Sequence, residues 1–175
     1  MPRRSARTRD LISLSPWGEG RGEGNQVLVD ASRGGPGAAS HARTLKKLAQ
    51  QFLTDLKLRN VELSLSLVRD PAIRTLNREW RGKDQPTDVL SFPAGDSPAP
   101  GVKPLGDIII SMDTARRAAK DFGTTRSQEL ALYLAHGLLH LLGHDHDVPA
   151  AARKMERLER QLLGHAGMLA RSDEL

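Results

Sequence analysis

The sequence predicts a single α/β domain (α+β-like) with one four-stranded sheet packed with about five helices. Three observations support this fold class. The 175 residues suffice for one domain with a sizeable core. Four short stretches show the patterns of strands, and amphipathic helical stretches lie among them. Only 3% of the residues are aromatic, so aliphatic side chains must fill the core.

Four strands are expected. Residues 26–31 form the first, and residues 61–68 alternate between apolar and polar side chains, which predicts a half-exposed strand. The third covers residues 87–92 and is closed by Pro93. Residues 106–111 are strongly apolar, so this strand is expected in the centre of the sheet.

Five helices are expected. Ser40 is the predicted cap of a helix that runs to about Leu56. A short helix begins at Asp70 and Pro71, because proline is favoured in the first turn, and it ends near Trp80. Two further helices are expected from Asp113 to about Phe122 and from Pro149 to about Leu163. Another begins at Thr125, which together with Gln128 resembles a capping box.

The two ends of the chain are expected to lie outside the folded domain, which is predicted for residues 25–165. Residues 1–24 are rich in Arg, Gly and Ser and are predicted to be a disordered N-terminal extension. The alternative for this extension is a basic arm that contacts RNA. Residues 166–175 are expected to form a flexible C-terminal tail.

Composition excludes several classes of protein. The chain has no Cys, which excludes disulfides, thiolate metal sites and a cysteine nucleophile. No stretch approaches the roughly 18 apolar residues of a membrane span. The basic N-terminus lacks the apolar segment of a signal peptide. We therefore expect a soluble cytoplasmic protein with no membrane partner.

A metal site is predicted at the end of a buried helix. Between residues 130 and 142 the only strongly polar side chains are His136 and His140, four residues apart on one helix face. Gly143 can end the helix in a left-handed conformation, so that the chain turns and brings His146 back. Three imidazoles suit one Zn²⁺ and leave a fourth position for water, which is the catalytic arrangement. The alternative is that these histidines are hydrogen-bonded core residues.

Gly137 argues against one related mechanism. Metalloproteases with a His-Glu-x-x-His helix use the Glu next to the first His as general base. Gly137 occupies that position here and cannot take a proton, so peptide hydrolysis by that mechanism is disfavoured. A glycine there is also expected to leave room for a bulky substrate near the metal.

Positive charge is concentrated in one segment. The chain has a net charge of +5, and residues 57–83 alone carry seven basic and three acidic side chains, or +4. A local excess of this kind suits a polyanionic partner such as nucleic acid. The alternative is an ordinary solvated face.

Several ordered motifs resemble the signature of the YbeY family, bacterial metal-dependent endoribonucleases of ribosomal RNA maturation. The resemblance spans roughly Gln26 to Gly164, and one departure is His144, where the family usually has Tyr. The matching stretches are Leu76-Asn77, Trp80-Arg81-Gly82-Lys83-Asp84, Pro86-Thr87-Asp88-Val89-Leu90-Ser91-Phe92-Pro93, Leu105-Gly106-Asp107-Ile108, and His-Gly-x-Leu-His-Leu-x-Gly-x-Asp-His from His136 to His146.

The resemblance implies a mixed sheet with the metal helix packed near it. It also implies a single-strand-specific, zinc-dependent endoribonuclease with one Zn²⁺ per chain. The expected partners are ribosomal RNA and the small ribosomal subunit rather than DNA, in maturation of the 16S rRNA 3′ end and in ribosome quality control. Two alternatives are a metal-stabilised ribosome assembly factor that binds without cutting, and a zinc hydrolase of a small molecule.

Arg81 is the expected catalytic residue. Its planar guanidinium can bind two phosphate oxygens at once, and the resemblance places the matching Arg at the active site. The alternative is a structural ion pair with Asp84 or Asp88. Lys83 is expected to assist electrostatically.

The sequence leaves alternatives open for the attacking group and for the residues next to the three histidines. Bound Zn²⁺ lowers the pKa of its water to about 7, so this water and the RNA 2′-hydroxyl are both candidate nucleophiles. Asp145 is expected either to orient a ligand histidine or to serve the turn after the helix. His144 is expected to be exposed, and the alternatives for it are a proton donor and a spare metal ligand.

Overall fold

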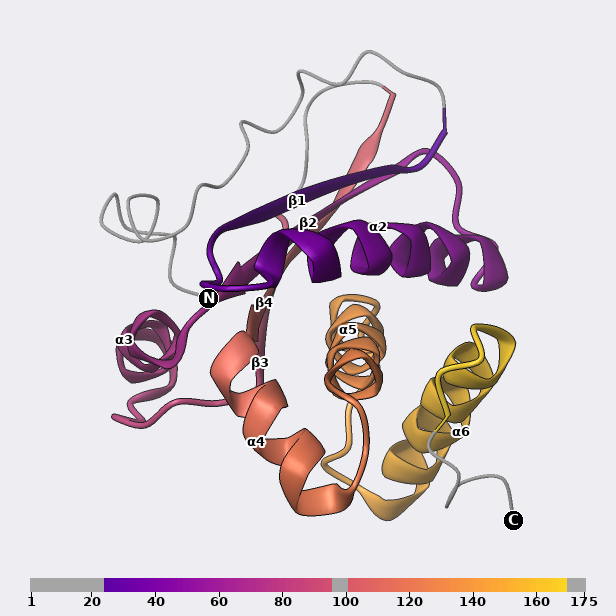
Figure 1. Ribbon diagram of the computed structural model, residues 1–175. Coiled ribbons are helices and arrows are strands. Elements are labelled where there is room, and N and C mark those ends of the chain that lie inside the picture. The colour runs from indigo at the N-terminus through magenta and orange to yellow at the C-terminus, as the bar shows by residue number, and fades with distance from the viewer. Residues whose placement is uncertain (1–23, 96–100, 170–175) are drawn as a thin grey trace.

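One mixed sheet is the centre of the fold (Figure 1). A computed structural model describes residues 24–95 and 101–169. The strands are β1 (Gln26–Arg33), β2 (Val61–Val68), β3 (Val89–Pro93) and β4 (Lys103–Ser111), in the spatial order β1-β2-β4-β3. β2 pairs in parallel with β1 and β4, whereas β3 is antiparallel to β4. The predicted four-stranded sheet is confirmed, and β4 is an interior strand as expected.

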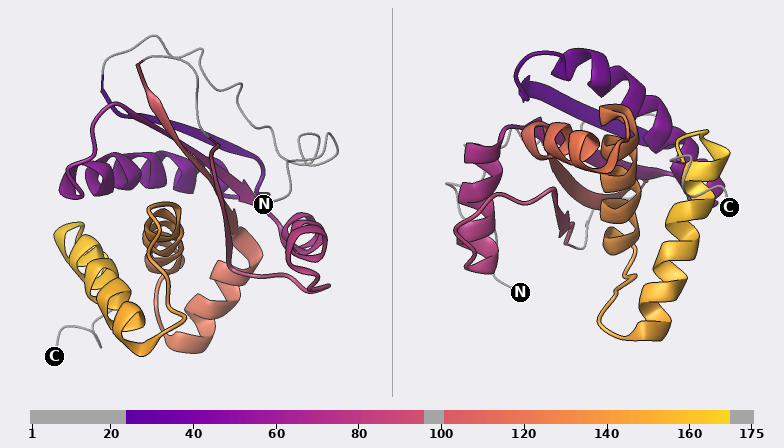
Figure 2. Two further views of the ribbon diagram at one scale, coloured as in Figure 1. Left: turned by 180° about the vertical axis from the view of Figure 1, so that it is seen from behind. Right: turned by 60° about the horizontal axis from the view of Figure 1, so that its bottom comes forward.

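Helices cover both faces of this sheet (Figure 2). The described residues contain five, as predicted: α2 (Ala38–Asp55), α3 (Asp70–Arg81), α4 (Met112–Phe122), α5 (Arg126–Leu141) and α6 (Pro149–His165). α2, α4, α5 and α6 contribute to the larger core, on one face of the sheet. α3 packs against the opposite face through Ile73 and Leu76, which contact a smaller cluster that includes Leu90 and Ile109.

β2 is more buried than the sequence predicts. Every residue of this strand is buried, so the expectation of a half-exposed strand is wrong. β2 lies between two neighbouring strands and both of its faces are covered, so Ser64 and Ser66 are enclosed together with the leucines. Glu62 is enclosed too, and burial together with the nearby Asp107 carboxylate raises its pKa.

The start of α2 also differs from its prediction. The helix begins at Ala38 rather than at Ser40, and Gly37 precedes it with φ of 81°. No side chain caps this end, so Ser40 is an ordinary first-turn residue. Glycine is suited to this place because a side chain would be strained at such a φ.

The start of α5 agrees with the sequence. The Thr125 hydroxyl accepts a hydrogen bond from the Gln128 backbone N–H at 3.2 Å. The Gln128 side chain accepts one from the Thr125 backbone N–H at 2.9 Å. This reciprocal capping box satisfies two backbone groups that the first turn would otherwise leave free.

The predicted N-terminal extension, residues 1–24, lies outside the described residues except for Gly24. The predicted tail is described only as far as Leu169. Met168 and Leu169 pack against the larger core, and the Leu169 carbonyl accepts a hydrogen bond from the Gln128 amide at 2.9 Å. Within residues 24–95 and 101–169, none of the helices has the length and apolarity that crossing a membrane requires.

Candidate metal centre

α5 supplies two of the three candidate ligands. Nine of its sixteen residues are buried, and His136 and His140 are half-buried on one face. The Ser91 hydroxyl of β3 donates a hydrogen bond to the Gly137 carbonyl at 3.1 Å, which ties the helix to the sheet beside both histidines. The pattern of a buried helix interrupted by two imidazoles is therefore realised as predicted.

The turn after α5 brings in the third histidine. Gly143 has φ of 87°, the left-handed conformation expected of it. The backbone N–H groups of Gly143 and His144 donate to the carbonyls of His140 and Leu139, each at 3.0 Å. These bonds close the helix end and reverse the chain, so that His146 returns to the two histidines on the helix.

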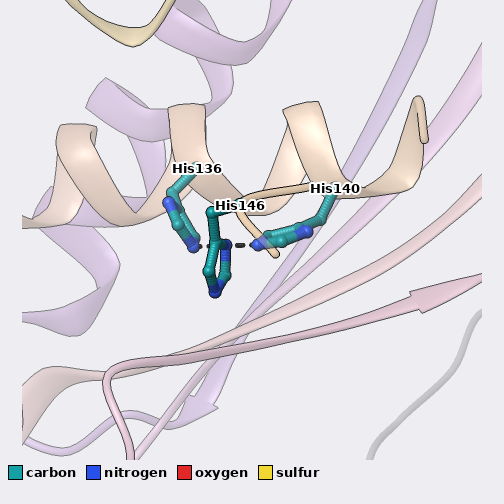
Figure 3. Close-up of side chains that lie close together, drawn as sticks. All are labelled: His136, His140 and His146. Carbon is teal, nitrogen blue, oxygen red and sulfur yellow. Dashed lines mark hydrogen bonds between the residues drawn. The ribbon is translucent and has the colours of Figure 1, made fainter. Parts of the chain in front are cut away.

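The three imidazoles face one another (Figure 3). One nitrogen from each of His136, His140 and His146 lies within 4.8 Å of the other two. The Nε2 atoms of His136 and His140 are 3.0 Å apart. The side chain of His146 is 58% exposed, so the cluster is open to solvent on one side.

This donor set fits a zinc ion. Tetrahedral Zn²⁺ binds imidazole nitrogens at about 2.0–2.1 Å, which separates them by about 3.3 Å, so small rotations of the rings complete the site. Burial lowers the pKa of His140, and the His136 and His146 rings lower it further. His140 therefore keeps the neutral form that binds metals.

An acidic residue from α6 completes the surroundings of His136. The Nδ1 atom of His136 lies 2.6 Å from Oε1 of Glu159, whose side chain is 15% exposed. Sequence reasoning missed this residue, although a signal was present. Glu159 lies four residues after Met155 and three before Leu162, so it occupies the inward face of the helix among core residues.

Comparison with known proteins gives the family. A family model described as Endoribonuclease YbeY matches residues 37–167. The chain belongs to the YbeY family. Proteins named Endoribonuclease YbeY are 57% identical over 85% of this chain in Myxococcus xanthus and 52% identical over 82% in Anaeromyxobacter dehalogenans. The chain spans 50% of the length of the first and 74% of the second.

A solved structure shares the fold of this chain. The solution structure of TM1509 from Thermotoga maritima matches this chain with a TM-score of 0.54 at 25% sequence identity. The match covers 81% of this chain and 91% of that one. The predicted fold class and the resemblance to the YbeY family are thus both confirmed.

In this YbeY chain, Arg81 comes from α3, an element other than the helix and turn that carry the three histidines. It is the last residue of α3, its side chain is exposed, and it enters no hydrogen bond or ion pair among the described residues. The expected alternative, a pair with Asp84, is not formed, because Arg74 holds that carboxylate with two bonds of 3.0 Å. Asp88 instead accepts hydrogen bonds from its neighbours Thr87 and Val89.

The residues beside His146 serve the turn. Asp145 accepts a hydrogen bond from the His146 backbone N–H at 2.7 Å, whereas its carboxylate is 3.9 Å from the His146 ring. This bond favours the turn role over the orienting role. His144 is half-buried rather than exposed, and its ring is not among the three that gather.

Gly137 has a different role from the one expected. A Cβ atom built there would lie 2.9 Å from Ile108 Cγ2, 3.0 Å from Ser91 Oγ and 3.2 Å from Val89 Cγ2. The bare face of the helix therefore points at the sheet, and the prediction that it makes room for a substrate is wrong. Glycine is needed because α5 approaches β3 and β4 closely.

Proposed function

We propose that this chain is a single-strand-specific, zinc-dependent endoribonuclease that acts on ribosomal RNA in the cytoplasm. Its expected tasks are maturation of the 16S rRNA 3′ end and ribosome quality control, with the small ribosomal subunit as partner. The observation that carries the proposal is the trio of imidazoles with one side open to solvent. Membership of a family whose members are named endoribonucleases supports the RNA substrate.

The three histidines and Arg81 are proposed to have different tasks. His136, His140 and His146 hold one Zn²⁺, which when bound supplies a Lewis acid and acidifies a water molecule. Arg81 binds the non-bridging oxygens of the phosphate, where negative charge develops during cleavage. Its side chain is available for this because no acidic partner among the described residues occupies it.

The basic surface proposed for RNA is smaller than the sequence indicates. Arg69 pairs with Asp113, and Arg74 and Arg78 pair with Asp84, so these three cations are partly neutralised. Asp84 lies one residue beyond the segment with the charge of +4 and was not counted in it. Arg81, the last residue of α3, and Lys83, which follows the helix, are the cations of this region that we assign to the RNA.

Cleavage of defined RNAs tests the proposal. Zinc-loaded protein is incubated with a single-stranded and a duplex RNA, alongside His136→Ala, Arg81→Ala and Arg78→Ala. We expect cleavage of the single strand alone and none by His136→Ala. Arg81→Ala should retain zinc and fold but lose activity by roughly 10²–10³-fold, the typical effect of removing one transition-state donor. Arg78→Ala, one helical turn earlier and already paired, is the matched control and should cut normally.

Other outcomes would point elsewhere. Tight RNA binding without metal-dependent cleavage products would favour the alternative that the protein is a ribosome assembly factor and not a nuclease. Hydrolysis of small esters without RNA cleavage would favour the small-molecule hydrolase. Full activity of Arg81→Ala would remove that residue from the mechanism while leaving the metal centre in place.

A further inference from the structure

We propose that Glu159 is a positioning residue that fixes the tautomer and orientation of His136 for metal binding. The inference rests on the proposed function, because it assigns a second layer of residues to the same metal site. It extends that site from α5 and the turn after it to α6, a segment to which the histidine pattern does not point.

The contact has the geometry of a charge-assisted hydrogen bond. Oε1 of Glu159 and Nδ1 of His136 are 2.6 Å apart, and both side chains are largely shielded, at 15% and 34% exposure. Bonds of this kind are shorter and stronger than neutral ones. Met155 and Leu162, each 2% exposed, anchor the same face of α6 in the core, so the carboxylate is held in place from both sides.

The contact determines which nitrogen is free. A carboxylate only accepts hydrogen bonds, so the His136 proton stays on Nδ1 and the lone pair is left on Nε2. Nε2 is the atom that faces the trio, since it lies 3.0 Å from Nε2 of His140. Without the carboxylate the proton can move to Nε2, where it would compete with the metal.

The negative charge of Glu159 has a second effect. Carboxylates bonded to metal-binding histidines raise the basicity of the ring and commonly add tenfold to hundredfold in metal affinity. A glutamine at this position can still accept a hydrogen bond from the His136 Nδ1–H but lacks the charge, whereas an alanine lacks both. The two substitutions therefore separate the hydrogen bond from the charge.

Metal affinity measured by competition with a chelator tests the inference. We compare the wild-type chain with Glu159→Gln, Glu159→Ala and Glu156→Gln, using Zn²⁺ as the probe. Glu156 lies one turn earlier on α6, is 65% exposed and pairs with Arg160, so it is the matched control. We expect zinc affinity to fall about tenfold in Glu159→Gln, up to hundredfold in Glu159→Ala, and not at all in the control.

A second readout needs no metal. Nitrogen NMR of the metal-free protein at pH 8 should show the His136 proton on Nδ1 in the wild type and a shift toward Nε2 in Glu159→Ala. If Glu159 had a merely structural role, Glu159→Ala would lower the unfolding temperature but would leave the His136 proton on Nδ1.

Three results would count against the inference. Wild-type zinc affinity in Glu159→Ala would overturn it, and so would an equal loss in Glu156→Gln, which would mean that disturbing α6 anywhere is enough. No zinc uptake by the wild-type chain would refute the proposed metal site itself. In that case the nitrogen signals would still show whether Glu159 holds the ring of His136.

Discussion

Asp70 is a clear case of a single side chain that joins two helices. It stands in the first turn of α3, and its carboxylate accepts hydrogen bonds from the Ser111 and Thr114 hydroxyls of the α4 start and from Arg117. Burial alone would raise the pKa of Asp70, but these three hydrogen bonds outweigh it and lower the pKa. The start of a helix also favours a negative charge.

Asp70→Asn tests this junction through its pH dependence. Because the folded pKa is lowered, the contribution of Asp70 is complete above its unfolded pKa of about 3.9 and is lost as the pH falls through the folded pKa. We expect the variant to lose about 1–2 kcal/mol of unfolding free energy at pH 7 and to show a flatter acid dependence. Denaturant unfolding at pH 7, 5 and 3 measures both.

The control for this prediction is Asp84→Asn. Its carboxylate is 50% exposed and pairs with two exposed arginines, so its loss should change stability much less. Equal stability of Asp70→Asn and the wild type at pH 7 would contradict the role assigned to the junction.

At the residue scale, the cluster of three histidines could be predicted from the sequence, whereas the contact between His136 and Glu159 could not. The spacing of His136 and His140 and the glycine at 143 are local features, so the sequence contains them directly. Glu159 comes from another helix, 23 residues along the chain, and its partner depends on how α6 packs on α5. Among the residues that the structure describes, no partner fixes the orientation of the exposed Arg81 side chain, so its role stays a prediction.

At the element scale, the close approach of α5 to the sheet decides where the metal centre lies. Gly137 points at Ile108 and Val89, so the helix backbone lies near β3 and β4. The two histidines that flank this glycine are placed by that approach. A pattern of side chains along one helix cannot show such a contact, because the partner strands lie elsewhere in the sequence.

Gly137→Ala is predicted to destabilise the fold. Alanine favours a helix over glycine by about 1 kcal/mol, but the new methyl group would meet buried atoms of a close-packed sheet. Overpacking of this kind costs about 1–3 kcal/mol, so we expect a net loss of roughly 1 kcal/mol in denaturant unfolding.

Gly164→Ala is the matched control for that substitution. Gly164 is a helical residue of α6, and among residues 24–95 and 101–169 a Cβ atom there would meet only Leu169 Cδ1, at 3.4 Å. This variant should gain about 0.5 kcal/mol. If both alanines stabilise the protein, the close approach of α5 is not what requires glycine at position 137.

Patterns along each element predicted the helices and strands well and their surroundings less well. The capping box at Thr125 and the proline start of α3 are short-range signals that the structure confirms. β2 has the alternation of a half-exposed strand yet is wholly buried, because burial depends on its neighbours in the sheet. Ser64 and Ser66 are small enough to be enclosed, and a pattern that separates only polar from apolar residues takes no account of side-chain size.

At the scale of the whole molecule, the sheet order places the metal centre within reach of solvent. β3 is an edge strand, and α5 packs on β3 and on its interior neighbour β4. The resemblance to the YbeY family implied a mixed sheet, which the structure confirms, but the order of the strands did not follow from the sequence. That order depends on long-range pairing between β2 and β4, which lie on either side of α3 and β3 in the chain.

X-ray absorption on the zinc-reconstituted protein tests the central claim most directly. We predict one Zn²⁺ per chain, bound by three imidazole nitrogens and one oxygen from solvent, at about 2.0–2.2 Å. Failure to take up zinc would contradict the account, and so would a closed shell in which a fourth protein side chain, such as His144, replaces the solvent oxygen.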